Sequence, residues 1–179
     1  MITALRGDPV TAAHALLGRL LVSTVGDQRV VIRITEVEAY GGEDDPASHA
    51  FRGETPRNRV MFGPAGHLYV YRSYGMHWCA NVVTGPPGTA SAVLLRGGVA
   101  VDGEAAMVQR RGRTTRIADG PGKLCQALGI TGAHNGTDLS NGEVRIEGRP
   151  MRGPTVSTPR IGITRAIDRL WRFRLMPGA

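Results

Sequence analysis

Four strand-like segments come in pairs joined by tight turns, and this pattern limits the possible fold more than any other feature. Residues 20–25 and 29–40 flank Gly26 and Asp27, while residues 67–73 and 77–84 flank Tyr74 and Gly75. Strands joined by so short a turn pair antiparallel, whereas parallel strands need a crossover of a dozen or more residues. The sequence therefore predicts a mainly antiparallel sheet built from hairpins.

Other segments predict helices and further strands around this sheet. Asp8 and Pro9 are typical of an N-cap and a first helical residue, so a helix is expected to about Leu17. We also expect helices over 104–111 and 123–128, a helical turn at Thr55-Pro56, an acidic loop over 41–53, and strands over 91–101, 143–147, 160–164 and 172–175. No linker divides the 179 residues. The expected fold is α+β, within the broader α/β class: one compact domain over residues 1–179, with a curved sheet, flanking helices and a protruding aromatic-tipped hairpin.

The charge balance favours a polyanionic partner. The chain has 22 Lys and Arg against 15 Asp and Glu, a net charge of +7. Nucleic acid is the simplest partner for such a surplus. A basic surface that contacts only solvent is the alternative, and charge alone does not separate the two.

Several classes of protein are disfavoured. Cys79 and Cys125 are too far apart in sequence for a zinc motif or a disulfide framework, which indicates a reducing, cytoplasmic setting. Residues 1–9 contain no apolar signal-peptide core. The longest uncharged run, residues 73–95, is interrupted by Pro86 and Pro87, so we expect no membrane partner.

The segment 29–40 carries two carboxylates in a strand-like pattern. With strict alternation, Ile32, Ile34, Glu36, Glu38 and Tyr40 share one face. Carboxylates on a face that begins apolar are costly unless paired or used, and a partly buried Glu suits a general base. The alternative is a strand end that turns both Glu side chains to solvent. A third possibility is a Mg²⁺-dependent nuclease that uses the acidic run 43–45.

The tyrosines are concentrated around the second hairpin. Tyr40, Tyr69, Tyr71 and Tyr74 lie within one stretch of sequence, with Tyr74 at the turn. An aromatic side chain at a hairpin tip suits insertion into a base stack, and tyrosines on a strand face can stack an extruded base. Taken singly, Tyr69 and Tyr71 fit a hydrophobic core equally well.

Together these motifs resemble the alkyladenine (3-methyladenine) DNA glycosylase family. The similarity runs from about residue 3 to residue 175. It rests on ordered motifs at residues 36–40, His49, 55–59, 68–71, 74–76, Asn81, 93–96, 120–128 and 160–163.

The resemblance implies a role for each matching residue. Glu38 matches the carboxylate that activates the attacking water, with Arg96 and the Ile161 carbonyl as further water contacts. Tyr74 matches the residue inserted in place of the flipped nucleotide. The base pocket is matched by Tyr40, His49, Tyr71 and Asn81, the last of which crowds a guanine amino group.

Basic residues are expected to contact the DNA backbone. The candidates are Arg57, Arg59, Arg110, Arg111 and Lys123, the last beside the glycine-rich entry to a helix. Arg113 and Arg116 extend the basic cluster around Arg110 and Arg111, which an exposed helix end would explain equally well.

The expected protein is a monofunctional DNA glycosylase that excises alkylated or deaminated purines from damaged double-stranded DNA. Its expected substrates are of the 3-methyladenine, 7-methylguanine, hypoxanthine or ethenoadenine class. The resemblance implies a fold other than helix-hairpin-helix, with no metal or other cofactor. We also expect no lyase activity, because Lys123 is the only lysine in the chain and lies more than 80 positions from Glu38. We expect a cytoplasmic monomer, associated with the nucleoid in a bacterium. The main alternative is a non-catalytic nucleic-acid-binding module with an aromatic platform.

Overall fold

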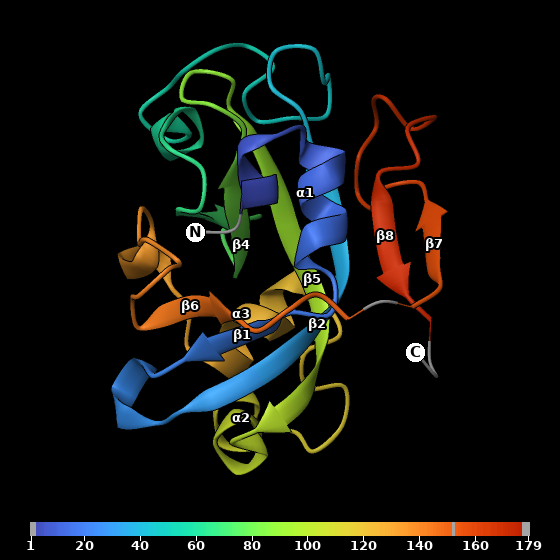
Figure 1. Cartoon of the computed structure of the whole chain (residues 1–179). Helices are drawn as coiled ribbons and strands as arrows, with labels where there is room; N and C mark the ends of the chain where they lie inside the picture. Colours follow the sequence, from blue (N-terminus) through green and yellow to red (C-terminus); the bar gives the residue numbers. More distant parts are fainter. Residues whose placement is uncertain (1–2, 152, 177–179) are drawn as a thin grey trace.

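The computed structural model describes residues 3–151 and 153–176 and has an α+β architecture, in which a curled antiparallel sheet carries three α-helices (Figure 1). Within the described residues the sheet has eight strands, and its main path runs β3-β4-β5-β2-β1-β6. β8 pairs with both β2 and β7. The strands are β1 (Leu20–Ser23), β2 (Val30–Tyr40), β3 (Leu68–Ser73), β4 (His77–Thr84), β5 (Ser91–Asp102), β6 (Val144–Glu147), β7 (Thr155–Thr158) and β8 (Arg172–Leu175).

Both predicted hairpins are present, as β1–β2 and β3–β4. The connection of the first is not the expected tight turn, because β1 ends at Ser23 and a short 3₁₀ helix over Val25–Asp27 leads to β2. At the tip of the second, Tyr74 and Gly75 have φ angles of 49° and 67°, and the Met76 N–H donates to the Ser73 carbonyl over 3.0 Å. A type I′ turn requires positive φ at both central residues. Gly75 adopts this conformation easily, whereas Tyr74 does so at a steric cost.

The helices also follow their local signals. In α1 (Pro9–Leu16) the Asp8 carboxylate caps the N–H groups of Val10 and Thr11, as expected for an N-cap. α2 (Glu104–Arg111) has the predicted bounds, and α3 (Pro121–Leu128) ends at Gly129 with φ 71°. The 3₁₀ helices are η1 (Thr3–Arg6), η2 (Val25–Asp27), η3 (Arg59–Phe62) and η4 (Gly132–His134). Figure 1 shows α1 lying across β2 and β5, where it closes one part of the core.

Strand β2 does not keep the strict alternation that its sequence suggests, so the prediction that Glu38 continues the face of Ile32 and Ile34 was wrong. The β2–β5 register is irregular between Ile34 and Val37. Up to Ile34, the β2 side chains in the main buried cluster come from even-numbered positions. Beyond Ile34 they come from odd-numbered positions, namely Val37 and Ala39. A local irregularity of this kind re-aims the side chains that follow it. Glu38 and Tyr40 consequently lie on the face opposite the core.

The irregularity coincides with a change of neighbour along one edge of β2. Residues 30–33 pair with β1, while residues 36–38 pair with β8. Between these pairings, Ile34 exchanges backbone hydrogen bonds with Gly18 and Arg19, at the entry to β1. The buried face of β2 therefore changes between its pairing with β1 and its pairing with β8, two strands from distant parts of the chain.

A strand predicted over residues 160–164 is also absent from the described structure. The nearest strand is β7, at Thr155–Thr158, and residues 160–164 follow an irregular path. Two interactions explain the difference: the Arg160 side chain is buried in an ion pair with Asp45, and the Ile161 N–H donates to a side chain. No α-helix in the described part of the chain is both long and apolar enough to cross a membrane.

Candidate active site

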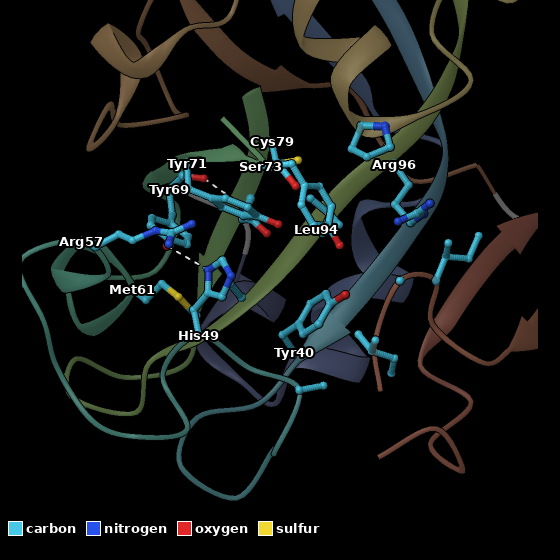
Figure 2. Close-up of a pocket in the computed structure, with 18 residues that line it drawn as sticks. Tyr40, His49, Arg57, Met61, Tyr69, Tyr71, Ser73, Cys79, Leu94 and Arg96 are labelled. Carbon is cyan, nitrogen blue, oxygen red and sulfur yellow. Dashed lines mark hydrogen bonds between the residues drawn. The ribbon is translucent and has the colours of Figure 1, made fainter. Parts of the chain in front are cut away.

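A cavity of about 520 Å³ opens between the β3–β4 hairpin, the sheet and two irregular segments (Figure 2). β2, β3, β4 and β5 supply most of its floor and walls, and residues 47–61 and 161–163 supply much of the remainder. Tyr74 on the β3–β4 turn and Pro121 at the start of α3 complete the lining. Figure 2 shows His49, Tyr69 and Tyr71 on one side, with Tyr40 and Arg96 on the other. The lining thus gathers residues from distant parts of the sequence.

Glu38 lies directly behind the cavity wall. Its side chain is 0% exposed and accepts three hydrogen bonds. The Ile161 N–H donates to Oε1 over 2.7 Å, the Tyr40 hydroxyl donates to Oε2 over 2.8 Å, and Arg96 Nη1 donates to Oε2 over 3.3 Å. All three donors line the cavity. Because a carboxylate has about four acceptor positions, Glu38 retains capacity for about one more donor.

The charge of Glu38 belongs to a four-membered network. Arg96 Nε donates to Glu36 Oε1 over 3.0 Å, and Arg172 Nε donates to the same oxygen over 2.7 Å. Burial alone would raise the pKa of Glu36, but hydrogen bonds from Arg172 and Arg96 outweigh burial and hold that pKa below its ordinary value. Two carboxylates and two guanidinium groups balance each other here, which limits the cost of burying Glu38.

Neutral aromatic rings form the opposite wall. The rings of His49 and Tyr71 meet edge-on at a centroid distance of 4.5 Å, and the Tyr69 ring lies 5.6 Å from that of Tyr71. Burial and the nearby Arg57 charge lower the pKa of His49, while burial raises the pKa of Tyr69 to about 12. These side chains are therefore uncharged at neutral pH. Such a wall suits stacking and edge contacts with a flat ring.

The deeper part of the cavity is built by β4 and β5. Asn81 is buried, and its Nδ2 donates to the Tyr69 carbonyl over 3.1 Å, which fixes the amide against the cavity. Cys79 lines the same region and is free, as is the buried Cys125. Both thiols are buried.

At the rim stands Tyr74, whose side chain is 86% exposed. This exposure agrees with the predicted position of Tyr74 at the hairpin tip. Met76 on the same turn is 68% exposed, and the motif at residues 74–76 contained it without a role of its own. The tip therefore presents two large apolar side chains to solvent.

The predicted backbone-contact residues separate into groups. Arg57 lines the cavity, 5.7 Å from the Tyr71 ring centroid, and Arg59 is exposed and paired with Glu54. A second cavity of about 620 Å³ shares Tyr74 with the first. Its basic lining residues are Arg111, Arg113, Arg116 and Lys123.

Arg110 has a different environment. Its guanidinium donates to the backbone carbonyls of Val25 and Ala127, and it lines neither of these two cavities. Arg111 also donates to a carbonyl, that of Ile117, although it lies at the second cavity.

Sequence reasoning missed the buried pair of Asp45 and Arg160. Both side chains are 0% exposed, and Arg160 donates to both Asp45 oxygens, over 2.5 and 2.8 Å. Asp45 had been considered as a metal ligand, and its carboxylate is occupied by this ion pair. Among residues 3–151 and 153–176, no group of three or more His, Cys, Asp or Glu side chains is placed to hold a metal ion. The motif at 160–163 indicated the position of Arg160 but not its partner.

Comparison with known proteins gives a consistent result. Residues 3–177 match the family model described as "Methylpurine-DNA glycosylase (MPG)". A Rhodococcus jostii protein is 57% identical over 178 residues, which cover 94% of this chain and 78% of the relative. A Mycobacterium tuberculosis (strain H37Rv) protein is 49% identical over 178 residues, covering 94% and 85% respectively. Both relatives carry the name "Putative 3-methyladenine DNA glycosylase".

Proposed function

The chain belongs to the methylpurine-DNA glycosylase family, and from this membership we propose that it is a monofunctional glycosylase that hydrolyses the bond between a damaged purine and its deoxyribose. Its substrates are alkylated or deaminated purines of the 3-methyladenine, 7-methylguanine, hypoxanthine or ethenoadenine class. The products are a free base and an abasic site in double-stranded DNA.

The placement of Glu38 carries this proposal. Its three donors leave capacity for about one more, and a water molecule is the donor that hydrolysis requires. The contact with Arg96 is the longest of the three, so we place the water where it would bridge Arg96 and Glu38. The Ile161 carbonyl is its proposed third contact.

The reaction follows from this arrangement. The bond from C1′ to the base nitrogen breaks, and its electron pair leaves with the base, so the sugar acquires oxocarbenium character. The carboxylate of Glu38 stabilises this charge and accepts the proton of the water whose oxygen bonds to C1′. An alkylated purine that already carries positive charge departs as a neutral base, whereas hypoxanthine or ethenoadenine must also take up a proton as the bond breaks.

The aromatic wall supports recognition of a flipped base. Tyr40, His49 and Tyr71 line the cavity, which we assign to the flipped purine. We assign to Asn81, whose amide is held by the Tyr69 carbonyl, the role of crowding a guanine amino group. A lesion with weakened pairing leaves the duplex at lower cost than an intact base. We assign Tyr74 to the gap that the flipped nucleotide leaves in the stack.

Phosphate contacts are assigned by exposure and position. Arg57 and Arg59 lie on the loop side of the cavity, while Arg111 and Lys123 lie at the second cavity. We no longer assign Arg110 to a phosphate. Its guanidinium donates to two backbone carbonyls, so we propose a structural role for it instead. We propose a monomer that acts on DNA in the cytoplasm.

Base release in EDTA tests the proposal. Duplexes containing hypoxanthine, ethenoadenine or methylated purines are incubated with the protein, and half of each sample is then treated with alkali. We expect free base in both halves and strand breaks only after alkali. Cleavage that requires added Mg²⁺ would indicate a nuclease. Lesion binding without base release would favour the non-catalytic binding module.

A further inference from the structure

The ion pair between Asp45 and Arg160 connects three segments that build the candidate active site. The Arg160 guanidinium also donates to the Ala39 carbonyl over 3.0 Å, at the end of β2. The Asp45 carboxylate accepts the N–H groups of Gly41 and Ala47, over 3.0 and 3.2 Å. The pair thus joins the end of β2, the loop that leads to His49 and the segment that begins at Arg160.

The pair also lies behind the residues that contact Glu38. The Arg160 guanidinium carbon is 4.6 Å from the centroid of the Tyr40 ring, within the range of cation–π contact. The residue after Arg160 is Ile161, whose N–H donates to Glu38. Neither Asp45 nor Arg160 lines the cavity, so any effect on chemistry passes through these neighbours.

We propose that Asp45 and Arg160 are positioning residues for the hydrolytic centre. The pair holds the Ile161 N–H against Oε1 of Glu38 and keeps the Tyr40 ring where its hydroxyl reaches Oε2. The fork of Arg160 is needed because it makes two bonds to Asp45, one bond to a carbonyl and a cation–π contact with the Tyr40 ring. A lysine ammonium keeps the charge but cannot reproduce that geometry.

The electrostatics of Asp45 agree with this role. Burial alone would raise the pKa of Asp45, but hydrogen bonds from Arg160 and Gly41 outweigh it and leave the pKa below its ordinary value. Removal of one partner would leave an unpaired charge in the interior and destabilise the fold. A test of positioning therefore has to keep the pair balanced.

Two variants meet this requirement. Arg160→Lys retains the charge without the fork, and the double substitution Asp45→Asn with Arg160→Gln removes both charges together. Glu147→Gln is the matched control, because it breaks another ion pair, that of Arg145 and Glu147 on β6. Neither of these two residues lines the first or the second cavity. Thermal unfolding first identifies a temperature at which every variant is folded.

The first measurement does not depend on activity. Amide hydrogen exchange should become faster at Ile161 by at least about tenfold in both Arg160 variants, while the β2–β5 amides keep their protection. The control should leave Ile161 unchanged. Unaltered exchange at Ile161 would overturn the proposal, and equal acceleration throughout the sheet would also do so by showing a purely structural role.

The second measurement rests on the proposed function. Single-turnover excision with enzyme in excess should slow by about 10²-fold in Arg160→Lys, since small displacements of reacting groups have effects of this size. Affinity for the lesion duplex should change by less than about threefold. Wild-type excision in this folded variant would overturn the proposal. If the wild-type protein excises nothing while Ile161 loses protection in the variants, the proposed function fails and the positioning role stands.

Discussion

The backbone N–H of Ile161 donates a hydrogen bond to Oε1 of Glu38 over 2.7 Å, although the two residues are 123 positions apart. The bond fixes one oxygen of a fully buried carboxylate and brings an irregular segment of the C-terminal part of the chain to β2. The other oxygen is held by Tyr40 and Arg96. In the proposed function, this orientation directs the remaining acceptor position at a water molecule.

Acid should destabilise the protein through Glu36 and Asp45. Both have a folded-state pKa below their ordinary values of 4.5 and 3.8, so the unfolded chain binds more protons as the pH falls. Their stabilising contribution is complete above those values and is lost as the pH falls through the folded-state pKa. Urea unfolding from neutral pH to about pH 3 should show a falling free energy of unfolding.

The substitution Glu36→Gln isolates one part of that effect. It should lower the free energy of unfolding at neutral pH and make the decline in acid shallower, because the titrating carboxylate is gone. A decline as steep as in the wild-type protein would show that Glu36 does not contribute to it.

Removal of the Tyr74 side chain should weaken binding to damaged DNA. A base–aromatic stacking contact is worth about 1–3 kcal/mol, so Tyr74→Ala should reduce lesion-duplex affinity by about 5- to 150-fold. Because the side chain is exposed, the melting temperature should barely change. Binding is measured at fixed salt, since phosphate contacts are salt-dependent. Tyr74→Trp serves as the control that retains a stacking ring, and an unchanged affinity in Tyr74→Ala would contradict insertion.

Lys123 should not form a covalent bond with DNA. It is the only lysine in the chain, and its Nζ donates to Asp119 over 2.9 Å at the second cavity. A lyase needs a free amine that attacks C1′ to form a Schiff base, and arginine does not serve as such a nucleophile. Borohydride added during turnover should trap no protein–DNA adduct. Efficient trapping that Lys123→Arg abolishes would move Lys123 into the catalytic centre.

Local signals account for the parts of the fold that sequence reasoning predicted. Asp8 caps α1 and Gly75 permits a tight turn through interactions with residues close in sequence. Helices and hairpins of this kind can therefore be predicted from short stretches of sequence. The face change in β2 does not, since it occurs where β1 and β8 meet the same strand from distant parts of the chain. Strict alternation therefore assigned Glu38 to the wrong face.

The same distinction applies to the candidate site. The cavity brings together Tyr40, His49, Tyr71, Asn81 and Arg96, which ordered motifs had already indicated. The pair of Asp45 and Arg160 was not predictable, because its partners are 115 positions apart and buried charge leaves no periodic signal. The prediction of a strand over residues 160–164 was wrong for the same reason, because the contacts of this segment with Asp45 and Glu38 are tertiary.

Single-turnover base excision by Glu38→Gln tests the central claim most directly. The amide keeps the size of the side chain but cannot accept a proton from water as a carboxylate does. With enzyme in excess over a lesion duplex, we expect nearly unchanged duplex affinity and excision slowed by at least about 10²-fold. Excision at the wild-type rate by folded Glu38→Gln would contradict the assignment of Glu38 as the residue that activates water.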